Sequence, residues 1–187
     1  MAGIVSNSRG ITTVTGSGSL GGTPFTDALI TLTANADTAN VTNTFSGQLF
    51  LVNNASTTVD VAGIGPGIFT EVITTSVYHP NQTAGISDPS AGILDVVNPV
   101  FATYDLTTSV GPVSGSAHFN IGLVFPTTAG NFEIDSTSGQ GTFQATSVPE
   151  PATLTLTAIG AFGLLFYRLQ RPARAVAPPV ARESGTC

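Results

Sequence analysis

The stretch Ala28-Leu-Ile-Thr-Leu-Thr-Ala34 alternates apolar and polar side chains along its length. Successive side chains of a β-strand point to opposite faces, so Ile30 and Leu32 share one face and the threonines share the other. The same period of two recurs in residues 57–61, 132–134 and 142–145. This pattern predicts strands that are buried on one face and exposed on the other.

Further segments surround these strands and have the composition of strands themselves. They are residues 44–52, 68–78, 101–106 and 117–123. Segments rich in glycine, proline or serine separate them and are predicted as turns or loops: residues 16–22, 63–67, 88–92, 111–112 and 138–141. Strands that follow one another every ~10 to 15 residues, with no helical pattern between them, predict an all-β fold: an antiparallel β-sandwich or jelly-roll-like domain.

The charge of the chain is low and unevenly distributed. Charged residues make up 9% of the 187 residues, and lysine is absent. Residues 1–149 contain one basic residue, Arg9, against nine acidic residues. Binding to nucleic acid requires a basic surface, so this acidic body argues against a nucleic-acid partner.

The character of the chain changes after residue 147. Ala152–Tyr167 runs for sixteen residues without a charge, and Arg168, Arg171 and Arg174 follow it closely. As a helix this run spans ~24 Å, short of the ~30 Å bilayer core but sufficient if the bilayer thins. The sequence therefore predicts a single C-terminal transmembrane-type helix, with a buried core helix as the alternative. By the positive-inside rule the arginines stay in the cytoplasm and the β-domain lies across the membrane.

Val148-Pro149-Glu150-Pro151, the apolar run and the arginine-rich end together resemble the PEP-CTERM sorting signal of Gram-negative bacteria. The resemblance implies that an exosortase, a membrane protease, reads and processes the segment at Pro149, Glu150 and Pro151. It also implies a bacterium that makes exopolysaccharide. The residues before the signal are similar to the β-rich bodies of other PEP-CTERM proteins, a likeness that implies no activity. A stiff proline linker is the alternative interpretation.

These observations divide the chain into three parts. Residues 1–147 form the exported β-rich domain, residues 148–174 the sorting and anchoring signal, and residues 175–187 an irregular tail. Residues 1–10 lack the basic and apolar regions of a Sec signal peptide, so we expect the native protein to have one that this sequence does not include.

Catalytic and metal-binding patterns are weak throughout the sequence. His79 and His118 lack the closely spaced partners of a zinc site, and we interpret both as structural. Asp88 and Asp95 lack EF-hand spacing and are expected to be solvated loop carboxylates rather than calcium ligands. The sequence therefore predicts no catalytic residues, no metal and no cofactor.

The function expected from the sequence is that of a non-enzymatic protein of the cell surface or extracellular matrix. We expect it to be associated with exopolysaccharide or biofilm and held, at least transiently, in the inner membrane by its C-terminal helix. The alternatives are a carbohydrate-binding module, for which exposed aromatic side chains are scarce, and an extracellular hydrolase.

Overall fold

The computed structural model of the chain describes residues 7–88 and 92–148. The strands are β1 (Asn7–Leu20), β2 (Thr23–Asp37), β3 (Thr42–Thr44), β4 (Leu49–Val61), β5 (Gly65–Ile68), β6 (Thr74–Tyr78), β7 (Thr83–Ser87), β8 (Gly92–Val97), β9 (Val110–Phe119), β10 (Val124–Thr127) and β11 (Gly130–Val148). Short 3₁₀ turns occur at η1 (Thr38–Asn40), η2 (Phe45–Gly47), η3 (His79–Asn81) and η4 (Pro99–Ala102).

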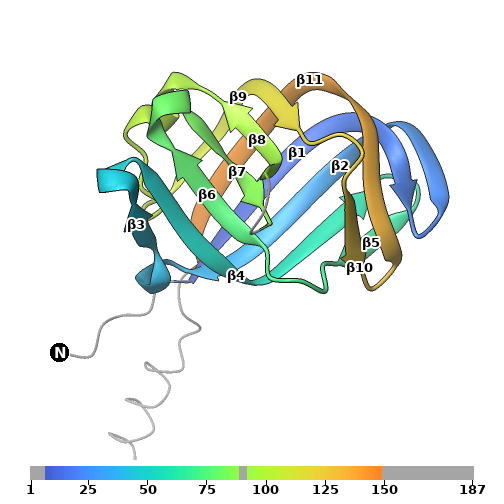
Figure 1. Cartoon of the computed structure of the whole chain (residues 1–187), viewed down its shortest axis with the longest axis horizontal. Helices are drawn as coiled ribbons and strands as arrows, with labels where there is room; N and C mark the ends of the chain where they lie inside the picture. The colour runs from blue at the N-terminus through green and yellow to red at the C-terminus, as the bar shows by residue number, and fades with distance from the viewer. Residues whose placement is uncertain (1–6, 89–91, 149–187) are drawn as a thin grey trace, which may run out of the picture. The chain divides into compact units, whose positions relative to one another are not determined.

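The strands form one sheet that closes on itself. They are hydrogen-bonded in the order β1-β2-β4-β6-β7-β8-β9-β11, and β11 also pairs with β1. The result is a closed eight-stranded antiparallel barrel. The short strands β3 and β5 add to β4, and β10 adds to β11, so β3 lies at one end of the barrel and β5 and β10 at the other (Figure 1).

The all-β, antiparallel class predicted from the sequence is confirmed, but the sandwich arrangement is wrong. Alternation of side chains predicts that each strand has an inner and an outer face, and a barrel meets that condition as well as a sandwich does. Closure depends on pairing between the first long strand and the last. Bulges in β1 around Gly16 and Gly18 interrupt its register with β11 and allow the strand to bend.

Four segments predicted as turns lie wholly or partly inside strands instead. Residues 16–20 belong to β1, residues 65–67 to β5, residues 111–112 to β9 and residues 138–141 to β11. At Gly18 a Cβ atom would overlap the carbonyl oxygen of Glu133, so this glycine allows two strands to approach closely. The strand predicted at residues 101–106 is also wrong, because this segment ends η4 and then runs irregularly.

Apolar side chains fill the barrel from end to end. One group includes residues from β2, β4, β7, β8 and β11, among them Ile30, Leu32, Val59, Ile86, Leu94 and Phe132. The second group gathers around Phe143, whose ring meets that of Phe101 edge-on with centroids 5.5 Å apart. The inward-facing positions of these strands are the apolar positions of the alternating pattern. An eight-stranded barrel is narrow enough for such side chains to fill it.

Segments outside the barrel strands add side chains to both core groups. Phe101, Tyr104 and Leu106, between β8 and β9, join the group around Phe143. Phe69 and Phe125 join the other group. The cavity lined in part by Tyr104 and Leu106 measures about 10 Å³, roughly the room for one water molecule. Because apolar side chains fill the interior, a functional site is expected on the outer surface of the barrel.

Candidate functional site

The sorting segment predicted from the sequence begins where the described chain ends. Strand β11 runs to Val148, which pairs with Asn7 of β1. The backbone N–H of Ser147 donates to the Ser109 hydroxyl at 3.0 Å, so β11 stays attached to its neighbours up to this point. Proline has no N–H with which to continue a ladder, and Pro149 comes next in the sequence. The last described residue of β11 thus directly precedes the Pro-Glu-Pro motif in the sequence.

The remaining residues of the predicted signal lie outside the described residues. These are Pro149, Glu150, Pro151, Arg168, Arg171 and Arg174, together with the apolar run between them. The predicted helix over this run is therefore not tested. Within residues 7–88 and 92–148, no helix is long and apolar enough to span a membrane.

His79 holds the irregular segment before β9 in place. Its Nε2 lies 2.8 Å from the backbone carbonyl oxygen of Tyr104, and a carbonyl only accepts, so this nitrogen carries a proton and donates it. The imidazole also lies against the Phe50 ring, with centroids 5.0 Å apart. The Tyr104 hydroxyl in turn donates to the Thr108 carbonyl at 2.9 Å. These contacts agree with the structural role predicted for His79.

Asp95 is not the solvated loop carboxylate that the sequence predicted. It lies within β8, half-buried on the outer face, where Leu94 and Val96 on either side of it point into the barrel. Strand register places Asp95 between Gly85 of β7 and His118 of β9. The prediction failed because the Asp88-Pro-Ser-Ala-Gly92 turn signals suggested that the loop extends further than it does.

A groove surrounds Asp95 on the outer face of β6–β9, and we call it the Asp95 groove. Its volume is about 520 Å³, and its lining residues are Tyr78, Asn81, Thr83, Asp95, Val97 and His118. Strand register aligns Tyr78, Thr83 and Val97 in one row and Asp95 and His118 in the next. Asn81 comes from η3. Pockets of about 300–1,000 Å³ are typical of small-molecule sites.

The Asp95 carboxylate is electrostatically unusual. Burial raises its pKa to about 6, and the nearby charge of His118 opposes part of that rise. No hydrogen bond to this carboxylate is formed by the part of the chain that the structure describes. A half-buried carboxylate without a hydrogen-bond donor is a group that a ligand can satisfy.

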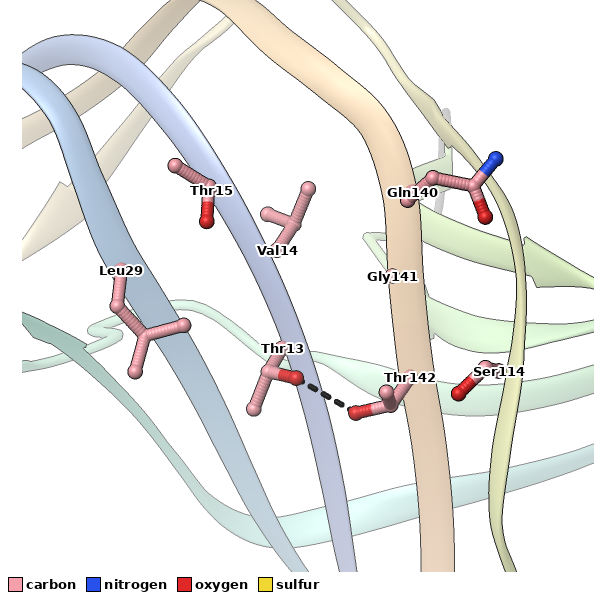
Figure 2. A pocket seen from close by; sticks show the side chains of 8 residues that line it. All are labelled: Thr13, Val14, Thr15, Leu29, Ser114, Gln140, Gly141 and Thr142. Carbon is pink, nitrogen blue, oxygen red and sulfur yellow. Dashed lines mark hydrogen bonds between the residues drawn. The ribbon is translucent and has the colours of Figure 1, made fainter.

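A second hollow lies where β1 meets β11, and we call it the seam groove. Its volume is about 340 Å³, and its lining includes Thr13, Thr15, Leu29, Ser114, Gln140 and Thr142. Figure 2 shows the hydroxyls of Thr13 and Thr142 turned toward each other across the seam, 2.6 Å apart. The lining has hydroxyl, amide and aliphatic groups but no ionisable side chain.

Neither groove contains the set of side chains that a metal centre needs. The described residues contain no group of three or more His, Cys, Asp or Glu side chains that could hold a metal ion. Sequence reasoning named Asp95 and His118 separately and missed their pairing. The pairing depends on the register of β8 against β9, for which the sequence gives no local signal.

Comparison with known proteins supports the assignment of the C-terminal segment. The family described as the PEP-CTERM protein-sorting motif matches residues 147–171, and the match begins at the end of β11. No curated protein and no solved structure matches the chain. The chain therefore carries a PEP-CTERM sorting motif, which marks an exported, cell-envelope-associated protein that an exosortase sorts.

Proposed function

We propose that this exported protein is a non-enzymatic component of the cell surface or extracellular matrix, and that the outside of its barrel associates with extracellular polysaccharide in a biofilm. The observation that carries the proposal is the contrast between a filled interior and a grooved, hydroxyl-rich exterior. Among the described residues, buried apolar side chains occupy the inside of the barrel. Its recognition surface is then its exterior.

The chemistry of that exterior suits a polyol. From Thr13 onward the outward positions of β1 are Thr13, Thr15, Ser17 and Ser19, which alternate with buried positions. Hydroxyl groups both donate and accept, so they exchange hydrogen bonds with sugar hydroxyls directly or through water, and no charge is needed. Arg9 is the only basic residue before residue 150, which disfavours strongly anionic partners.

For the C-terminal part we propose a membrane-spanning helix at residues 152–167, with Arg168, Arg171 and Arg174 in the cytoplasm. The support is the uncharged run and the position of all three arginines on one side of it. Replacement of the three arginines by glutamine should give mixed orientations, because no basic residue flanks the other end. Reporter fusions at residue 180 measure the orientation, and an external reporter in the unsubstituted protein contradicts the proposal.

A hydrolase is the second candidate, and the raised pKa of Asp95 is the observation that favours it. A carboxyl group with a pKa of about 6 keeps its proton in weakly acidic conditions and can serve there as a general acid. Most glycosidases also need a second carboxylate, whereas Asp95 is the single carboxylate in the lining of this groove, which weighs against the hydrolase. Release of reducing ends from polysaccharide, abolished in Asp95→Asn, would favour the hydrolase over the binding protein.

Sorting is tested at Glu150, which carries the charge of the Pro-Glu-Pro motif. The full chain, supplied with a signal peptide and a C-terminal epitope, is expressed in a host that contains an exosortase. We expect the unsubstituted protein to lose the epitope and Glu150→Gln to keep it, because a charge-assisted contact with the protease is removed. Retention of the epitope by both proteins contradicts a processing site and favours a permanent anchor.

Association with polysaccharide is tested in the same host. We expect the processed protein to fractionate with the extracellular matrix, and enzymatic digestion of the matrix polysaccharide to release it. A strain that makes no exopolysaccharide should shed the protein into the medium. Equal retention with and without exopolysaccharide contradicts the proposed association.

A further inference from the structure

The Asp95 side chain occupies space that a neighbouring glycine leaves open. A row of outward positions crosses the barrel through Ser76, Gly85, Asp95 and His118, each paired with the next across a strand boundary. Gly85 contributes nothing to the outer face, so the Asp95 side chain lies over it. A Cβ at this position would overlap one carboxylate oxygen of Asp95. The glycine thus makes space for the carboxylate to lie close to the sheet.

A second glycine leaves room for the other carboxylate oxygen. A Cβ at Gly92 would lie 2.8 Å from Oδ2 of Asp95, closer than atoms of this kind approach one another. The two glycines therefore leave the space that the Asp95 carboxylate occupies beside the sheet.

The walls of the groove supply the other contacts that a sugar needs. Asn81 and Thr83 both donate and accept hydrogen bonds, and the Tyr78 phenol does the same beside a flat apolar ring. Val97 adds an aliphatic surface. A pyranose ring has the complementary character, with hydroxyls at its rim and C–H groups on its faces. A groove with an aromatic wall and a few polar groups is a typical small-molecule site.

The charge of the groove restricts the class of ligand. Asp95 repels uronate and phosphate groups, and neither arginine nor lysine lines the groove to attract them. A calcium ion would need six to eight oxygen ligands at about 2.3–2.6 Å, and the lining has one carboxylate. A neutral polyol meets none of these obstacles.

We infer that the Asp95 groove binds one sugar unit of a neutral polysaccharide, with the Asp95 carboxylate accepting hydrogen bonds from ring hydroxyls and Tyr78 packing against the ring. This inference rests on the proposed association with polysaccharide and assigns that association to one site. It also gives a reason for a half-buried carboxylate without a hydrogen-bond partner, since bound hydroxyls supply the missing donors.

The test is calorimetric titration of the full chain in a polyoxyethylene detergent, which has no sugar headgroup to compete. The probes are cellohexaose, maltohexaose and mannohexaose as neutral oligosaccharides, and hexagalacturonate as the acidic comparison. We expect binding of at least one neutral hexamer and none of hexagalacturonate. Asp95→Asn should weaken that binding at least tenfold, because charge-assisted hydrogen bonds are replaced by neutral ones.

Two further variants separate the site from general effects. Tyr78→Ala should weaken binding about tenfold, whereas Tyr78→Phe should retain most of it because the ring remains. Asp60→Asn removes an exposed carboxylate on β4, and Thr142→Val alters the seam groove. Both controls should bind as the unsubstituted protein does.

The outcomes distinguish failure of this site from failure of the proposed function. Unchanged affinity in both Asp95→Asn and Tyr78→Ala overturns the site, and binding that depends on Thr142 would move it to the seam groove. Binding of hexagalacturonate, or of no neutral hexamer, overturns the inferred ligand class. Retention of the protein in the polysaccharide matrix is measured independently, so the proposed function survives either result if retention persists.

Discussion

The two grooves on the barrel surface are built from the same kind of strand and differ in how their polar groups are satisfied. In the seam groove the hydroxyls of Thr13 and Thr142 lie 2.6 Å apart and bond to each other. In the Asp95 groove the central polar group has no such partner, and burial has raised its pKa to about 6. The first arrangement stabilises the closure of the barrel, and the second leaves a site that a ligand can satisfy.

Alternation of apolar and polar residues along a strand therefore does not by itself distinguish a structural face from a binding face. Thr13 and Asp95 both occupy outward positions in alternating strands. What distinguishes them is the residue across the strand boundary, which is a hydroxyl partner for Thr13 and the side-chain-free Gly85 for Asp95.

Filling the space beneath Asp95 should have the largest effect. In Gly85→Ala the new methyl group meets both the backbone carbonyl oxygen of Leu94 and the Asp95 carboxylate. We expect a loss of about 3–4 kcal/mol in the free energy of unfolding, because strand backbones have to move apart. Chemical denaturation measures it. Gly10→Ala is the matched control, since its nearest neighbour would lie at 3.8 Å, and a comparable loss there would contradict the argument.

Removal of the Asp95 charge should stabilise the barrel at neutral pH. The folded-state pKa is raised from 3.8 to about 6, so the folded protein holds this proton more tightly than the unfolded chain does. The associated stability is fully present below about pH 4 and is lost as the pH rises through about 6.

Asp95→Asn has no carboxylate to ionise and so avoids that loss. We expect its free energy of unfolding to be about 2–3 kcal/mol higher than that of the unsubstituted protein at pH 8, and equal to it near pH 3.5. Urea denaturation across this pH range checks both limits. Asp60→Asn is the control with an exposed carboxylate, and it should change stability little at either pH. A gain at pH 8 that persists undiminished at pH 3.5 would show that ionisation is not the cause.

The parts of the molecule that sequence reasoning predicted correctly are those with a local signal. The alternation in residues 28–34 and 57–61 lies within β2 and β4 as expected, and the Pro-Glu-Pro segment lies within the matched sorting motif. Barrel closure has no such signal, because it depends on β1 pairing with a strand more than a hundred residues away. The pairing of Asp95 with His118 also follows from register between strands.

Thr12 and Thr13 are neighbours in β1, and their hydroxyls differ in whether they have a hydrogen-bond partner. Thr12 points into the barrel, is fully buried, and its hydroxyl has no hydrogen-bond partner among the described residues. Thr12→Val replaces this hydroxyl by a methyl group of similar size, so we expect a gain of about 1–2 kcal/mol in the free energy of unfolding. Thermal and chemical denaturation measure it. A loss of stability would indicate that a bound water satisfies the hydroxyl.

The smallest expected effect belongs to the seam, where a double-mutant cycle isolates the hydrogen bond between Thr13 and Thr142. Either single substitution to valine leaves one hydroxyl of a partly buried pair without its partner, and each should cost about 0.5–1.5 kcal/mol. The double variant removes both hydroxyls and leaves none unsatisfied, so it should cost less than the two single variants combined. Additive losses would mean that the hydroxyls are satisfied by solvent, and that the seam is as open to a ligand as the Asp95 groove.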